Sequence, residues 1–165
     1  MFGKGGVLLR TFTLLKGQPV FNKNSGEIIG HVSDLKLSTE GTIDSIVIDQ
    51  RGLFGRDKHI PVQDITSFGH DGVMIQPQES HSVGYDKESH YLCHGQGLIG
   101  QLLFTTEGEK LGIVEDVYFD EQLGTIIGYE VSEGFFADIT EGKKVVKTTN
   151  PLQFGQDIIL IEINM

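Results

Sequence analysis

The sequence predicts an all-β protein that consists of two small antiparallel β-barrels derived from an internal duplication, with minimal helix. A nine-residue stretch beginning at Gly26 returns 82 residues later at Gly108 in the form Gly-Glu-x-x-Gly-x-Val-x-Asp. A shorter element, Phe-Gly-x-Asp, begins at Phe68 and returns 86 residues later. The 22 glycines also favour many tight hairpins over long helices.

This repeat divides the 165-residue chain into four parts: a tail, a barrel, a linker and a second barrel. Each barrel is near the lower size limit at which a hydrophobic core supports itself, so we expect the two barrels to pack together. A sheet of five or six short strands buries one of its faces best by curling into a barrel, which also removes its exposed edges. The expected boundaries are 1–10, 11–78, 79–97 and 98–165.

Strand signals occupy equivalent places in the two repeats. They are short runs that alternate at period two or are rich in β-branched and aromatic residues. The runs are 35–37, 46–48 and 73–75 in the first repeat, and 117–119, 126–131 and 158–163 in the second. Helix signals are confined to two prolines, which predict short helical turns near 61–64 and 150–152.

The charge is unevenly distributed between the two halves. The net charge is −10, and residues 81–165 carry 5 Lys and Arg against 14 Asp and Glu, whereas residues 1–80 carry 8 against 9. Phosphate backbones are bound through Lys and Arg, so direct nucleic-acid binding is disfavoured.

The remaining composition indicates a cytoplasmic protein. No apolar run reaches the roughly 20 residues of a membrane span, and the N-terminus lacks the apolar core of a signal peptide. The single cysteine, Cys93, excludes an intrachain disulfide.

The order of these elements resembles the PRC-barrel domain, a family that includes a domain of the photosynthetic reaction-centre H subunit and the C-terminal domain of a bacterial ribosome-maturation factor. The resemblance covers roughly 11–78 and 98–163. The second repeat departs from the pattern where Lys147-Thr148 replaces Pro61-Val62. In the first repeat the matching residues are Val20, Gly26, Gly30, Val32, Asp34, Gly41, Ile46, Ile48, Ile60, Pro61, Val62, Asp64 and Ile65. In the second they are Gly108, Gly112, Val114, Asp116, Gly124, Val131, Val146, Phe154 and Asp157.

The resemblance implies a β-barrel protein that works by binding other macromolecules, with no enzymatic activity and no cofactor. The principal hypothesis is a protein-interaction or adaptor module with an unknown protein partner. An accessory role in RNA processing or ribosome assembly, exerted mainly through a protein partner, is the alternative. A homodimer and a small-ligand site between the barrels remain open. No nucleophile motif or phosphate-binding loop occurs in the sequence.

Three sets of residues are candidates for special roles. The repeated glycines and aspartates fit a structural role, because glycine permits close backbone approach and aspartate accepts backbone N–H bonds. These are Gly26, Gly30, Asp34, Gly108, Gly112 and Asp116. The second set lies at two apolar hairpin tips, which either pack on a barrel or contact a partner. It comprises Arg51, Leu53, Phe54, Arg56, Lys58, Phe135 and Phe136. The third set, His90, Cys93 and His94, is a weak candidate for metal binding, because no second cysteine pair accompanies it.

Overall fold

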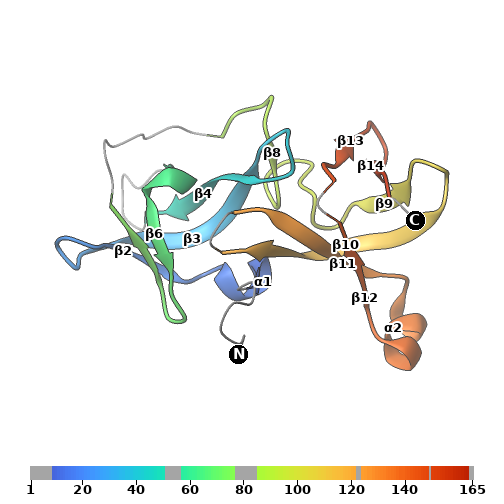
Figure 1. The fold of residues 1–165 in the computed structure, drawn as a ribbon, viewed down its shortest axis with the longest axis horizontal. Helices are drawn as coiled ribbons and strands as arrows, with labels where there is room; N and C mark the ends of the chain where they lie inside the picture. Colours follow the sequence, from blue (N-terminus) through green and yellow to red (C-terminus); the bar gives the residue numbers. More distant parts are fainter. Residues whose placement is uncertain (1–8, 51–56, 77–84, 122–123, 149, 164–165) are drawn as a thin grey trace.

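The two repeats fold into two seven-stranded sheets in the computed structural model, which confirms the all-β prediction (Figure 1). The structure describes residues 9–50, 57–76, 85–121, 124–148 and 150–163. The first sheet contains β2 (Pro19–Asn22), β3 (Ile28–Leu37), β4 (Ile43–Asp49), β5 (Lys58–Pro61), β6 (Ile65–Phe68) and β7 (Val73–Ile75). The second contains β9 (Leu102–Thr105), β10 (Lys110–Asp120), β11 (Ile126–Ser132), β12 (Lys144–Lys147), β13 (Gln153–Phe154) and β14 (Ile159–Ile161).

Both sheets have the same strand order, as a duplication requires. The order is β5-β4-β3-β2-β7-β6 in the first sheet and β12-β11-β10-β9-β14-β13 in the second. The prediction of antiparallel strands holds for all pairs but one in each sheet, because β2 pairs with β7, and β9 with β14, in parallel. Within the described residues, the two strands at the ends of each order do not pair with each other, so each sheet curls but does not close into a barrel.

The helices of the described residues are short, and the sequence predicted only one of them. The turn expected after Pro61 is the 3₁₀-helix η1 (Val62–Asp64), whereas the turn expected at 150–152 is not helical. The predicted second hairpin tip is instead a seven-residue helix, α2 (Phe135–Glu141). The other helix, α1 (Phe12–Leu15), is a single turn. None of the helices in the described part of the chain has the length and apolar character needed to cross a bilayer.

Each sheet is completed by the segment that precedes the other repeat. β1 (Leu9–Thr11), near the N-terminus, pairs with β10 of the second sheet. β8 (His90–Tyr91), between the repeats, pairs with β3 of the first sheet. We call 9–15 and 90–98 the exchanged segments. The region 85–97, expected as a linker, therefore contributes a strand and the fully buried Leu92 to the first half of the molecule.

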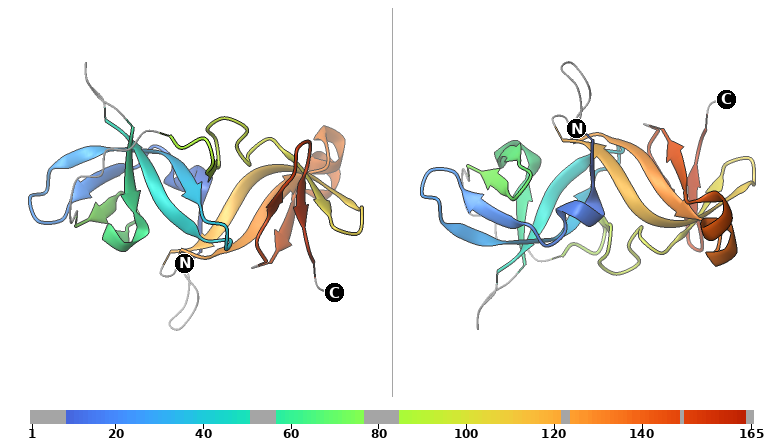
Figure 2. Two further views of the ribbon diagram at one scale, coloured as in Figure 1. Left: turned by 90° about the horizontal axis from the view of Figure 1, so that it is seen from above. Right: turned by 90° about the horizontal axis from the view of Figure 1, so that it is seen from below.

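The two halves share one hydrophobic core. The turns after β3 and β10 meet at the centre of the molecule (Figure 2), where Thr42 bridges to Thr125 and the Ile43 N–H donates to the Gly124 carbonyl at 2.8 Å. Phe68 packs edge-on against Phe119, with 5.6 Å between ring centroids. Buried residues of both repeats form a single cluster, so the two sheets pack against each other within one chain.

Candidate functional site

The repeated aspartates reach the buried face of each sheet through a β-bulge. The pairing of β3 with β4 shifts between Val32 and Asp34, and that of β10 with β11 shifts between Val114 and Asp116. A bulge adds one residue to one strand and re-aims the side chains beside it. Asp34 is 1% exposed as a result.

Both aspartates hold the exchanged segments by their backbone. Asp34 Oδ1 accepts the Leu35 N–H at 2.8 Å and the Cys93 N–H at 2.9 Å, and Asp34 Oδ2 accepts the His94 N–H at 2.9 Å. Asp116 Oδ1 accepts its neighbour's N–H and the Thr13 N–H, at 3.1 Å. Buried polar groups need such partners, so each carboxylate satisfies backbone donors of the segment that docks on its sheet.

The repeated glycines lie where the backbone approaches another strand or turns sharply. A Cβ atom at Gly30 would lie 2.6 Å from the Asp49 carbonyl oxygen, and one at Gly112 would lie 2.5 Å from that of Ser132. The other pair, Gly26 and Gly108, has positive φ angles of 70° and 93° in the preceding turns.

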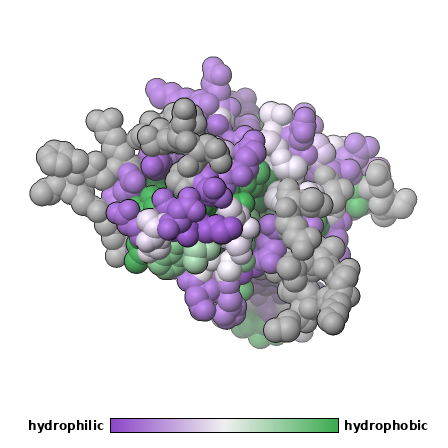
Figure 3. Space-filling model, turned by 60° about the vertical axis from the view of Figure 1, so that its left-hand side comes forward, coloured by the Kyte–Doolittle hydropathy of each residue, from purple (hydrophilic) through white to green (hydrophobic). Residues whose placement is uncertain are grey.

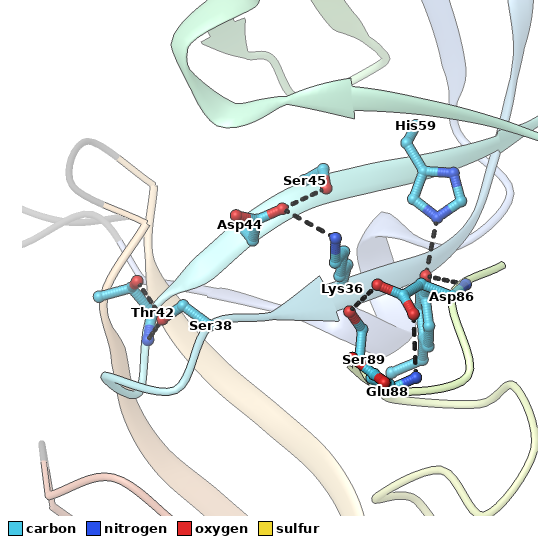
Figure 4. A network of polar contacts seen from close by, with 10 residues as sticks. Lys36, Ser38, Thr42, Asp44, Ser45, His59, Asp86, Glu88 and Ser89 are labelled. Carbon is cyan, nitrogen blue, oxygen red and sulfur yellow. Dashed lines mark hydrogen bonds and ion pairs between the residues drawn. The ribbon is translucent and has the colours of Figure 1, made fainter. Parts of the chain in front are cut away.

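Four aromatic rings cover the Asp34 junction. Tyr85 stacks on His94, with 3.5 Å between ring centroids and 10° between ring planes, and meets Tyr91 edge-on at 4.7 Å. His59 Nε2 lies 3.1 Å from the Tyr91 hydroxyl, which accepts the Asp86 N–H at 3.0 Å (Figure 4). Burial, followed by the charge of Asp34, raises the pKa of Tyr85 to about 12.

A groove of about 380 Å³ opens beside this cluster. One wall comes from the segment before the second repeat, through Tyr85, His90 and His94. The other wall comes from the second sheet, through Phe154 and Gly155. Its volume is within the range of small-molecule sites and suits one or two side chains of a partner.

The weak metal candidates line or border this groove without forming a ligand set. His90 stacks on Phe154, with 3.7 Å between centroids and 5° between planes, while His94 stacks on Tyr85. Partial desolvation of its thiol, followed by the charge of Asp34, raises the pKa of Cys93. Across the described ranges, no three His, Cys, Asp or Glu side chains are grouped so as to hold a metal ion.

The structure describes little of the predicted hairpin-tip surface. Arg51, Leu53, Phe54 and Arg56 lie outside the described residues, and Lys58 is half-buried at the start of β5. Phe135 and Phe136 open α2, but their side chains lie outside the description. The role of these residues in partner binding stays a prediction.

The outer face of the first sheet carries a row of apolar side chains. Ile28, Phe21 and Met74 are opposite one another on β3, β2 and β7, and Ile28 is 56% exposed. Figure 3, in which the left-hand side of Figure 1 is turned forward, shows an apolar band bordered by hydrophilic side chains. The equivalent row in the second repeat begins with Lys110 in place of Ile28.

The sequence left open a ligand site between the two repeats but did not identify the residues that form this groove. Its walls belong to two segments whose contact depends on the exchange, and no local pattern reports such a contact. One available signal was the recurrence of Gln18 as Gln101 and of Gly69 as Gly155, because Gln101 and Gly155 line the groove.

Comparison with known proteins agrees with this architecture. The chain is 28% identical over 145 residues to the uncharacterized protein YrrD of Bacillus subtilis (strain 168), and the alignment covers 87% of this chain and 82% of that protein. The PRC-barrel domain family matches at two places, residues 10–81 and 95–164, which together span most of the sequence and contain β2 to β7 and β9 to β14 respectively. The chain therefore belongs to the PRC-barrel domain family and carries two copies of that domain.

Proposed function

We propose that the protein is a non-enzymatic cytoplasmic interaction module that holds a segment of a partner protein in the groove between its two repeats. The observation that carries this proposal is the joint construction of the groove from the segment before the second repeat and from β13 and β14 of the second sheet. Two of its titratable side chains, His90 and His94, are engaged in ring stacks, which suits a binding surface better than proton transfer. The cytoplasmic location is supported by the single free cysteine.

Comparative affinity capture tests this function. The wild-type protein, a groove variant (Phe154→Ser) and a surface control (Ile139→Ser, at a residue 65% exposed on α2) serve as bait in the same cell extract. We expect a partner that the wild type and Ile139→Ser retain and that Phe154→Ser loses. A partner set that is identical for all three baits contradicts the assignment of the groove.

The predicted hairpin tips are tested in the same experiment. Phe54→Ala and Phe136→Ala baits report whether those residues contribute to capture. Loss of the partner with either tip variant, together with retention by Phe154→Ser, would move the contact surface from the groove to the tips.

A further inference from the structure

The two exchanged strands place different side chains at one equivalent position. Arg10 of β1 is opposite Phe119 in the second sheet, and His90 of β8 is opposite Leu37 in the first sheet. Leu37 and Phe119 are separated by 82 residues, the offset of the repeat. Arg10 and His90 are therefore structural counterparts.

The Arg10 side chain is held by several acceptors. Arg10 Nη1 donates to the Gly69 carbonyl at 2.9 Å, and Arg10 Nη2 donates to Gln18 Oε1 at 3.0 Å. Glu121 adds an ion pair at 3.8 Å, and the Arg10 side chain is only 14% exposed. The fold thus provides acceptors that fit a guanidinium group at this place.

The second place keeps the two hydrogen-bond acceptors, whereas the counterpart of Glu121 is Thr39. The Gln18 and Gln101 carbonyls accept equivalent N–H groups, from Val32 and Val114 respectively, each at 2.9 Å. The turn at Gly155 repeats that at Gly69, since each N–H donates to a carbonyl three residues on. Gln101 and Gly155 both line the groove. Within the described ranges, no side chain donates to Gln101 Oε1 or to the Gly155 carbonyl.

The charge around the groove favours a cation. Asp86 lines it, and hydrogen bonds from Glu88 N–H and Ser89 Oγ–H lower the pKa of its carboxyl, so Asp86 is ionised at neutral pH (Figure 4). Asp34, which accepts the His94 N–H, is a second carboxylate next to the groove. Lys87 at the rim opposes it, but the chain as a whole carries −10.

We propose that the groove receives an arginine side chain of a partner protein, whose guanidinium donates to the Gly155 carbonyl and Gln101 Oε1 as Arg10 does to their counterparts. The His90 and Phe154 rings, which stack on each other, form the wall of the groove beside these acceptors. This inference rests on the proposed function, because it names the chemistry of the segment that the groove holds.

Amide chemical shifts of the ¹⁵N-labelled protein test the occupant. The probes are the peptide acetyl-Gly-Arg-Gly-Arg-Gly-amide, its citrulline analogue, which has the same shape without the charge, and adenosine monophosphate. We expect saturable shifts at Asp86, Gly95 and Gly155, with the arginine peptide binding about 10-fold more tightly than the citrulline peptide, since charge-assisted hydrogen bonds are about twice as strong as neutral ones. Equal binding of the two peptides, shifts confined to other surfaces, or tighter binding of the nucleotide overturns the proposal.

Matched variants test the geometry. His90→Arg supplies a guanidinium from within the chain, as Arg10 does, and we expect it to weaken peptide binding about 10-fold. The control His70→Arg, which adds the same charge at an exposed turn, stays within about 2-fold of wild type, because exposed charges contribute little.

A second pair of variants covers the case in which His90→Arg fails to fold, as judged from its amide spectrum. Gln101→Leu removes one acceptor and weakens binding about 3-fold or more, whereas Gln63→Leu at an exposed position leaves it unchanged. Unaltered binding by Gln101→Leu overturns the proposal. If the arginine peptide does not bind but capture still depends on Phe154, the proposed function stands and only this inference fails.

Discussion

At the scale of single residues, the buried aspartates connect the sequence repeat to the architecture. Asp34 and Asp116 recur at the same place in the repeated motif, and each accepts backbone N–H groups from a segment far away in the sequence. The bonds from Cys93 and Thr13 cross 59 and 103 residues of chain respectively. A carboxylate that accepts several backbone donors fixes the position of a docked segment without requiring any particular side chain in that segment.

Removing the Asp34 carboxylate should therefore strongly destabilise the protein. Asp34→Ala leaves the Cys93 and His94 N–H groups without their acceptor, at a cost of about 1–3 kcal/mol for each buried group, so we expect a total loss near 3 kcal/mol. Asp34→Asn keeps one acceptor oxygen and should lose less. Urea unfolding measures both free energies.

The control is Asp71→Ala, at an exposed turn position, which should change stability by about 0.5 kcal/mol or less. A free energy of unfolding for Asp34→Ala within that margin would show that the exchanged segment does not depend on the carboxylate.

At the scale of elements, α1 shows how little local sequence contributes to an exchanged segment. The helix has four residues, and Thr11 caps it by accepting the Leu14 N–H at 3.4 Å. A single turn is not stable alone, because nucleation costs more than its few hydrogen bonds return. Phe12 and Leu15 are buried in the shared core, and this packing holds the segment on β10.

Two substitutions in this one turn should separate packing from helix propensity. Phe12→Ala removes a ring that is 3% exposed and should cost about 3–5 kcal/mol, whereas Leu14→Ala, at a side chain 69% exposed, should be nearly neutral. Hydrogen exchange should also show faster opening at Phe119 of β10, which is opposite Arg10 of β1, in Phe12→Ala. Similar stabilities for the two variants would mean that α1 does not anchor β1.

Local signals explain which elements could be predicted. The strand runs and the turn after Pro61 follow from residue preferences and alternation, and the repeat itself located the buried aspartates. The exchange has no local signal, because Leu9–Thr11 and His90–Tyr91 pair with strands of the distant repeat. The residues that line the groove could not be identified for the same reason, because their contact depends on the exchange. The 134–138 segment was predicted as a hairpin tip because Gly134-Phe135-Phe136 aligns with Gly52-Leu53-Phe54 of the first hairpin, whereas the chain forms a helix there.

At the scale of the whole molecule, the exchange and the shared core make two sequence repeats into one structural unit. Each sheet depends on a segment from the other side of the repeat boundary, and the core cluster draws on both repeats. Neither half keeps all its contacts when the other unfolds, so we expect a single cooperative unfolding transition.

Matched core substitutions test this cooperativity. Leu35→Ala and Leu103→Ala remove fully buried side chains from the first and second sheets, and each should cost about 2–5 kcal/mol. In both variants, far-ultraviolet circular dichroism and tyrosine fluorescence should report one coincident transition, shifted as a whole. A two-step transition in which only the mutated half moves would establish independent domains.

The reciprocal exchange also suggests how such a chain could have originated. A polypeptide with one copy and its own leading segment could complete its sheet only by lending that segment to a second molecule and borrowing one in return, which describes a symmetric homodimer. Joining the two copies in one gene replaces that bimolecular assembly by an intramolecular one at high effective concentration. Fusion also allows the sequences of the two repeats to diverge. The first repeat has an arginine at position 10, whereas the second has a histidine at position 90 and most of the negative charge. Asymmetry of this kind, unavailable to an obligate homodimer, would give a fused pair one specialised face.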